Sequence, residues 1–459
     1  MAMHNFSYTP LLRMLALCAA VALLMAPRAS AQKHIQDMDD KVDSIYMQSG
    51  ARYIHEWNRL ITDVMIDDGW SPPIATRYYA YANVAAFQAA MPGFPMCRSL
   101  EGQLAGLKDV PKPDLKQTYD WRVSAIAAYQ KITKKLLARS YRSDSLYALH
   151  MQQIAATGVP ADVIDRSKLF GESVGDHIIK WLMTDGYVNI TARSRYVIPK
   201  GTGMWEPTEP DFKEPADPFW NTMRPMTLTT AGQFPPDPPA KFSANPKSEF
   251  HRNANEVFQT GKNLTDEQRT IALYWNDNPI TTRHYGHLMY TVRWMTPPGH
   301  WINITREVSE KKGLGMIESL EAYTLVSIAV YDGFISCWTE KYHSNVIRPI
   351  SYIHRYMDST WEPLIQTPPF PEHSSGHSTI SAAAATILTH LLGEFSFTDS
   401  TTLLIGFQPR TFKNFMEAAR EAGMSRLYGG IHYRTGNQAG TKNGVQVGEW
   451  VFQKVHTRI

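Results

Sequence analysis

Lysine and arginine stand seven residues apart in one short block of the chain. The block is "KYHSNVIRP", which begins at Lys341 and contains Arg348. Seven residues span about two helical turns, so both side chains could point the same way. Pro349 disfavours helical geometry at the residue before it, so we expect a long helix to end near Arg348. Taken alone, the block is more simply interpreted as two solvated surface charges.

A second block, "PFPEHSSGHSTISAAAATIL", contains the start of a helix that is predicted over residues 378–392 and followed by Gly393. It places Ser375, Gly376 and His377 at the helix N-terminus. Free backbone N–H groups and the helix dipole make such an end a site for anions. The alternative is structural: Ser375 would be a helix cap and Gly376 a tight turn.

The third block is "SRLYGGIHYRTGN", with Arg426 and His432 on either side of a glycine pair. Gly423 is expected to end the preceding helix, and the glycine pair at 429–430 to bend the chain. The alternative is a glycine loop with an incidental cation and histidine.

The three blocks together supply several cations, a helix N-terminus and two histidines. This inventory suits a tetrahedral oxyanion with two or more charges, because arginine offers planar paired donors and lysine a point charge. One histidine could attack or bind the central atom, and the other could move protons near neutral pH. The cations are Lys341, Arg348 and Arg426.

Helical periodicity dominates the rest of the chain, and alternating strand patterns are scarce. Thr265 and Gln268 have the spacing of a capping box. We therefore predict an all-α protein. Further helices are expected over residues 53–65, 74–90, 117–137, 161–183, 265–275, 316–341, 412–422 and 444–455.

Residues 197–246 interrupt the helical pattern and are rich in proline and aromatic residues. Flexible linkers rarely carry such aromatics as Trp205 and Trp220, so we expect an ordered arm over the helices. The length of 459 residues would allow several domains. We predict a single helical domain over 32–459, with the oxyanion site within 338–436.

Composition narrows the class of protein and its compartment. The formal charge is +3, so nothing favours a nucleic-acid partner. Residues 1–31 contain a basic residue, a short apolar run and "ASA", which predicts a signal peptide and a secreted or periplasmic protein. A lipoprotein signal at Cys18 is the alternative. No later stretch is expected to span a membrane. Of the remaining cysteines, Cys97 and Cys337, the second is expected to be a buried free thiol.

The order K-x6-RP, SGH and SR-x5-H resembles the signature shared by vanadium-dependent haloperoxidases and type 2 phosphatidic acid phosphatases. Flanking segments look like bacterial haloperoxidases, and they extend the resemblance over most of the chain after residue 31. They are "SPPIATRYYAYANVAAFQA", "YWNDNP" and "TPPGHW". The resemblance implies the helical bundle of that superfamily.

The resemblance also implies a role for each block. His377 would be the acid–base group, and His432 would bond to vanadium or attack phosphorus. The oxygens of vanadate, or of phosphate in the same site, would be held by Lys341, Arg348, Ser375, Gly376 and Arg426, with Lys341 also polarising bound peroxide. Two departures stand out: Ser374 replaces the usual Pro before Ser-Gly-His, and Gly436 replaces an Asp that would orient His432.

Vanadate and phosphate share one shape, so other features must separate the two activities. Membrane phosphatases of the superfamily need several spanning helices, and its soluble phosphatases are generally shorter. Trp338 and Phe370 resemble residues on the halide side of haloperoxidase pockets, although both could be ordinary core aromatics. We therefore expect an exported haloperoxidase that oxidises iodide or bromide with hydrogen peroxide, and whose oligomeric state is open. The alternatives are a soluble acid phosphatase acting through a phosphohistidine at His432, and a protein that only captures the anion.

Overall fold

The computed structural model describes residues 50–279 and 281–459. The predicted signal peptide and Cys18 lie outside these residues.

Helices make up most of the described chain, which confirms the predicted all-α class. Two antiparallel hairpins are the exceptions: β1 (Thr281–Tyr285) pairs with β2 (Leu288–Val292), and β3 (Phe397–Asp399) with β4 (Arg410–Phe412). The α-helices are α2 (Ala51–Asp68), α3 (Pro72–Ala90), α4 (Trp121–Leu136), α5 (Ser140–Ala155), α6 (Ala161–Leu182), α7 (Tyr187–Thr191), α8 (Glu249–Lys262), α9 (Asp266–Tyr274), α10 (Pro297–Lys312), α11 (Met316–Ser344), α12 (Pro349–Tyr356), α13 (Gly376–Leu392), α14 (Phe415–Tyr428) and α15 (Arg434–Lys454).

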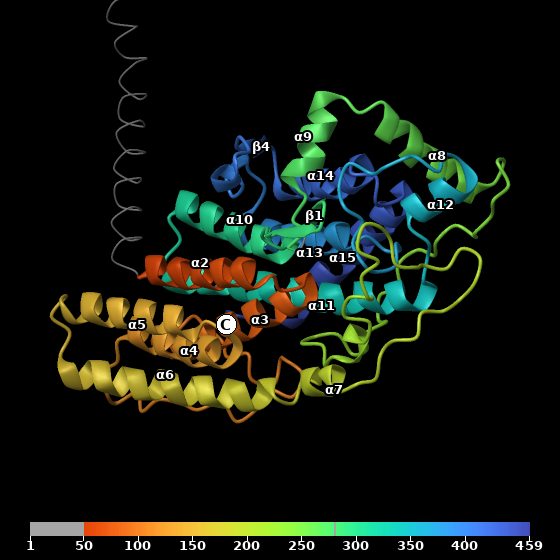
Figure 1. Cartoon of the computed structure of the whole chain (residues 1–459). Helices are drawn as coiled ribbons and strands as arrows, with labels where there is room; N and C mark the ends of the chain where they lie inside the picture. The colour runs from red at the N-terminus through yellow and green to blue at the C-terminus, as the bar shows by residue number, and fades with distance from the viewer. Residues whose placement is uncertain (1–49, 280) are drawn as a thin grey trace, which may run out of the picture.

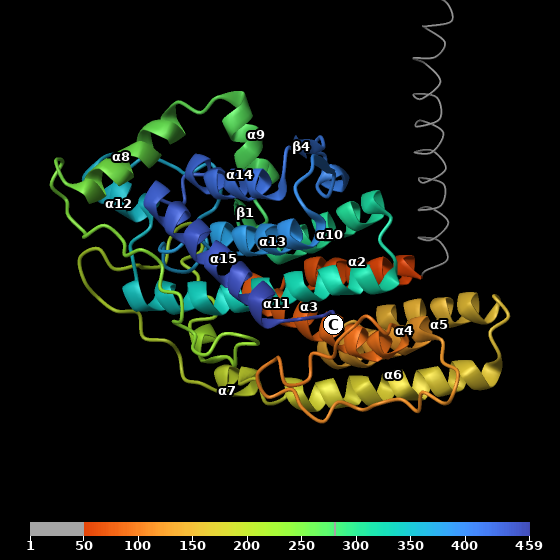
Figure 2. The ribbon, with the colours of Figure 1, turned by 180° about the vertical axis from the view of Figure 1, so that it is seen from behind.

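The helices are stacked in layers around α11 (Figures 1 and 2). α4, α5 and α6 form one side of the molecule, and α3 packs between α4 and α11. On the other face of α11 lies α13, which also contacts α14 and α15. One hydrophobic cluster joins these layers, from Tyr53 to Val455. Lys341, near the end of α11, is thereby fixed in the interior.

Close contact between α13 and α15 depends on glycines spaced four residues apart on α15. They face α13 and stand where any side chain would meet its backbone. A methyl group at Gly444 would lie 2.0 Å from the carbonyl oxygen of Thr379. The two helices can therefore approach closely only because these positions lack side chains. The glycines are Gly440, Gly444 and Gly448.

Several expected helix limits are wrong, and each has a physical reason. Gly423 does not end a helix: α14 continues to Tyr428, and a side chain at Gly423 would meet the Ser378 hydroxyl at 2.9 Å. α11 ends at Ser344, and the left-handed Asn345 follows it. Arg348 is extended, as expected for the residue before Pro349, and it precedes α12. Helical spacing therefore does not bring it towards Lys341.

Other helices were found where sequence periodicity gave weak signals. α5, α7, α8, α10 and α12 were not among the predicted helices, and α15 begins ten residues earlier than expected. The glycines of α15 hide its apolar stripe, since they bury a face without carrying apolar side chains. The capping box at Thr265 and Gln268 is present at the start of α9.

α11 tests the expectation that no later stretch spans a membrane. By length and composition it would pass as a membrane-spanning helix. In the structure its apolar window is entirely buried within the protein, so the surrounding helices cover it. Cys337 lies on this helix as a buried free thiol, and Cys97 is also free and buried.

The proline-rich arm over residues 197–246 is laid across the helices. Trp205 and Trp220 are buried. The carboxylate of Asp332 on α11 accepts hydrogen bonds from the backbone of Met226 and Thr227. The arm also contacts the predicted pocket residue Trp338, whose indole N–H donates to the carbonyl oxygen of Ala216.

Candidate active site

A cavity lies between the second and third sequence blocks, and the predicted site residues Lys341, Arg348 and Ser375 do not line it. Its volume is about 60 Å³. Its walls come from the end of α9, the loop before α13, the first turn of α13 and the connection between α14 and α15. Of the predicted site residues, it is lined by Trp338, Phe370, Gly376, His377, Arg426 and His432.

Two of the three predicted cations converge on one short segment behind this cavity. Lys341 Nζ donates to the carbonyl oxygens of Pro371 and Glu372, at 2.8 and 3.0 Å. Arg348 Nε donates to the carbonyl oxygen of Phe370 at 2.8 Å. Residues 370–372 therefore bring together two cations whose backbones are not on the same helix.

Arg426 reaches the wall of the cavity from the last turn of α14. Its Nη1 donates to the backbone oxygens of Trp275 and Asn276 at the end of α9. Arg426, Arg348 and Lys341 each expose at most 1% of their surface. Burial lowers the pKa of Lys341 to about 7, that of Arg348 to about 10 and that of Arg426 to about 9.

The buried cations have unused donors, which fit an oxyanion. Arg348 Nη2 and Arg426 Nε are buried without a hydrogen-bond partner in the described residues. Lys341 has three N–H donors and uses two of them on carbonyl oxygens. Buried charges without partners are costly. A tetrahedral anion in this place would satisfy the donors and offset the charge.

His432 is held by a carboxylate that the sequence analysis did not identify. Its Nδ1 donates to Glu372 Oε1 at 2.8 Å, and the backbone N–H of Tyr433 donates to the same oxygen at 3.1 Å. With its hydrogen on Nδ1, neutral His432 has a lone pair on Nε2. Arg348 Nη1 lies 3.1 Å from this atom. Burial and the nearby cations hold the pKa of His432 well below its usual value.

Gly436 explains how Glu372 reaches the histidine. A side chain at position 436 would begin 2.3 Å from Glu372 Oε1, so the carboxylate occupies the space that a larger residue would take. The expected Asp is absent from α15, and a Glu from the loop before α13 orients His432 instead.

His377 has a different environment. Its Nε2 accepts from Arg426 Nη1 at 3.0 Å and lies 3.9 Å from Asp277 Oδ2. Its side chain keeps 17% of its surface exposed. Burial, Arg426 and His300 place its pKa well below the usual value. The ring is therefore neutral at the cavity wall, and its surroundings oppose protonation.

The first turn of α13 lies against the same cavity. Ser375 is its N-cap, and its side chain accepts from the backbone N–H of Ser378. The amides of Gly376 and His377 are first-turn donors without acceptors inside the helix. A side chain at Gly376 would begin 3.3 Å from the Trp338 ring, so the glycine also lets that ring pack.

Two aromatic residues form an apolar wall. The ring centroids of Trp338 and Phe370 are 4.9 Å apart, and both residues line the cavity. Lys341 Nζ and the Arg348 guanidinium each lie 5.0 Å from the Phe370 ring centroid. The Phe370 ring therefore attracts the positive charges of Lys341 and Arg348.

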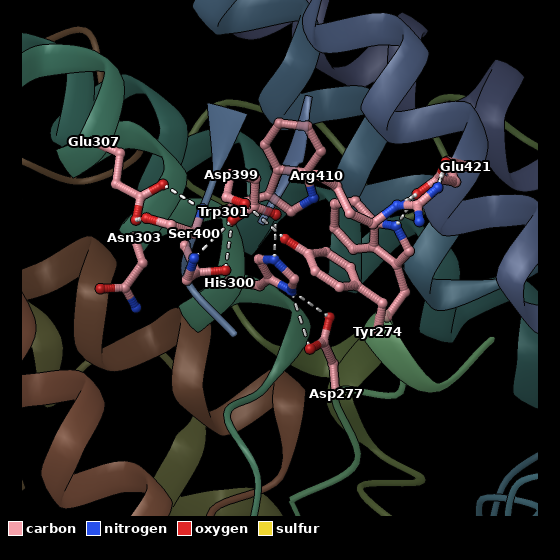
Figure 3. A network of polar contacts seen from close by, with 12 residues as sticks. Tyr274, Asp277, His300, Trp301, Asn303, Glu307, Asp399, Ser400, Arg410 and Glu421 are labelled. Atoms are coloured by element: carbon pink, nitrogen blue, oxygen red, sulfur yellow. Dashed lines mark hydrogen bonds and ion pairs between the residues drawn. The ribbon is translucent and has the colours of Figure 1, made fainter. Parts of the chain in front are cut away.

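Sequence reasoning also missed an acidic network at the other side of the cavity (Figure 3). Asp277 lines the cavity, and His300 connects it to Asp399. Asp277 and His300 lie in "YWNDNP" and "TPPGHW", which were noted only as resembling relatives. An aspartate and a histidine beside prolines, in two segments that resemble relatives, were the available signal.

Comparison with solved structures identifies the family. A bacterial vanadium-dependent iodoperoxidase superposes with a TM-score of 0.82 and 37% identity, over 89% of this chain and 97% of that one. The chain belongs to the vanadium-dependent haloperoxidase family. The family described as "VCPO second helical-bundle domain" matches residues 321–459 of this haloperoxidase.

More distant structures share the fold. A holo-type bacterial vanadium-dependent chloroperoxidase aligns with a TM-score of 0.63 at 15% identity, over 84% of this haloperoxidase and 94% of that chain. Its apo-type structure gives 0.63 at 14% identity, over 84% and 96%. A search of curated proteins finds no significant match.

Replacing Glu372 by Ala should weaken vanadate binding by about 10- to 100-fold, because the His432 ring loses the acceptor that orients it. Vanadate titration by calorimetry measures the effect. Glu449→Ala is the matched control, since Glu449 pairs with His390 at 2.9 Å on a more exposed part of the surface. Equal affinities in all three proteins would contradict the role of Glu372.

Proposed function

We propose that this haloperoxidase binds vanadate in the cavity and oxidises iodide, and more slowly bromide, with hydrogen peroxide to hypohalous acid. The observation that carries the proposal is the set of unused donors on Arg348, Arg426 and Lys341 around a histidine lone pair. Bound vanadate would supply a Lewis acid that activates peroxide without changing its own oxidation state.

Each protein group then has a task that its environment supports. His432 Nε2, its lone pair fixed by Glu372, would bond to the metal. The cations and the first-turn amides of α13 would hold the oxygens. The neutral His377 would take a proton from peroxide and return one to the leaving oxygen. Lys341 would polarise the oxygen that is transferred.

The apolar wall supports iodide as the preferred halide. The rings of Trp338 and Phe370 offer few polar groups that could take the place of the water bound to a halide. Iodide is the most weakly hydrated of the common halides and the easiest to oxidise, so it loses least on entering. The similarity to a bacterial iodoperoxidase points the same way.

Phosphatase activity is the second candidate because the same geometry could serve it. An Nε2 lone pair inside a cationic cradle is what in-line attack on phosphorus requires, and it would form a phosphohistidine at His432. Phosphate and vanadate would then compete for one site.

One experiment separates these functions. Purified protein free of vanadate should not oxidise iodide with peroxide, and added orthovanadate should restore the reaction. Inorganic phosphate should inhibit the restoration by competition. The vanadate-free form is assayed in parallel on a phosphate monoester. Hydrolysis there, with no halide oxidation in the vanadate-loaded form, would favour the phosphatase.

The two histidines should respond differently to removal. His432→Ala should lose most bound vanadate, because a bond to the metal is removed. His377→Ala should keep much of it, because the cations remain, yet lose turnover by roughly a hundredfold or more. Vanadium content by elemental analysis is compared with iodide oxidation rates. A metal-free His377→Ala beside a loaded His432→Ala would reverse the roles.

We also propose that the protein is exported, on the basis of the signal-peptide pattern in residues 1–31. The mature chain should begin at Gln32 and be recovered from the periplasm or medium. N-terminal sequencing of protein expressed from the full-length sequence measures this. Recovery of a lipid-modified Cys18 would replace the proposal with a lipoprotein.

A further inference from the structure

His300 is a buried histidine between two carboxylates (Figure 3). It lies in the first turn of α10 and has no exposed surface. Its Nδ1 is 3.0 Å from both oxygens of Asp277, and its Nε2 is 2.8 Å from Asp399 Oδ2. The Trp275 ring stacks on it, with centroids 4.4 Å apart.

This arrangement requires a hydrogen on each ring nitrogen. A carboxylate accepts and does not donate, so a neutral ring with one N–H would leave one contact without a hydrogen. Burial alone would lower the pKa of His300, but Asp277 and Asp399 raise it to about 10. His300 is therefore an imidazolium at neutral pH.

The two carboxylates differ in what else they contact. Asp399 is anchored away from the cavity: its Oδ1 accepts from the backbone N–H and the hydroxyl of Thr401. Asp277 faces the cavity and depends on His300 for hydrogen bonds to both oxygens. Its Oδ2 is 3.9 Å from His377 Nε2.

His377 needs a nearby negative charge if it is to carry a proton. Its surroundings oppose the charged ring, through burial, Arg426 and the positive charge of His300 itself. The carboxylates outnumber the imidazolium, so the group Asp277, His300 and Asp399 carries a net negative charge. The Asp277 end of that group is the one next to His377.

We propose that His300 is a positioning residue, anchored by Asp399, that holds the Asp277 carboxylate against His377 so that His377 can take and return protons. The inference rests on the proposed function for the role of His377. It assigns His300 and Asp399 to the reaction although neither lines the cavity.

The competing interpretation is that His300 only stabilises the core. A double-mutant cycle separates the two, because residues that act through one another are not additive. His300→Gln and Asp277→Asn should each lower kcat for iodide oxidation by about tenfold or more. In the Asp277→Asn background, His300→Gln should lower kcat by less than about twofold, since its partner is already gone.

Vanadate affinity provides the second readout. It should stay within about threefold of the parent in His300→Gln, because the cations and His432 are untouched. His150→Gln is the matched control: His150 is another fully buried histidine bonded to a carboxylate, Glu56 at 2.6 Å. It should lower the melting temperature without lowering kcat.

If His300→Gln does not fold, Asp399→Asn tests the same proposal. Its amide oxygen can still accept from Nε2, but the charge is lost. It should lower kcat in the parent background and have little further effect on Asp277→Asn. Additive losses in both cycles, or an unchanged kcat in the single variants, would overturn the proposal.

A readout without turnover separates this inference from the proposed function. In protein labelled with ¹⁵N-histidine, His300 should show two exchange-protected imidazole N–H protons at neutral pH, both missing in His300→Gln. A single proton would overturn the imidazolium, whatever the enzyme does with halide. If the parent protein shows both protons but oxidises no halide with vanadate, the contacts of His300 with Asp277 and Asp399 are supported and the proposed function is wrong.

Discussion

Three cations are buried together with fewer carboxylates than would balance them, and the rest of the structure is arranged to hold them there. Lys341, Arg348 and Arg426 donate mainly to backbone carbonyl oxygens, which bring dipoles but no full negative charge. The carbonyls come from residues 370–372 and from the end of α9. These contacts fix the position of the cations without neutralising their charge. Burial of that charge is unfavourable, as the lowered pKa values of Lys341 and Arg426 show.

That constraint explains why helices pack so closely at this end of the molecule. The loop before α13 must reach Lys341 and Arg348 while its Glu372 also reaches His432 on the far side. Glycines on α15 make this possible, since Gly436 leaves space for Glu372 and Gly440 for the carbonyl oxygen of Ser375. Because the loop before α13 lies close to α15, the Glu372 carboxylate replaces the Asp that the family pattern places on α15.

The sequence predicted the cations, both histidines and the helix N-terminus because those residues fall in short blocks with fixed spacing. It also predicted the long apolar helices. It could not predict Glu372 or Asp277 as partners, because Glu372 and His432 are 60 residues apart and meet only through tertiary packing. Lys341 and Arg348 do lie close together, but the predicted reason, that both are on one helix, is wrong. Both donate hydrogen bonds to residues 370–372.

The two histidines differ chiefly in how closely a carboxylate holds them. Glu372 lies 2.8 Å from His432 Nδ1, near enough to fix the hydrogen there and leave a permanent lone pair on Nε2. Asp277 lies 3.9 Å from His377 Nε2, which is too far for a hydrogen bond, and we propose that its charge helps His377 to carry a proton. A metal ligand needs a lone pair that does not move, and an acid–base group needs one that can be filled and emptied. Under the proposed function, the difference between a direct and an indirect carboxylate contact is what gives two buried imidazoles in one cavity these separate tasks.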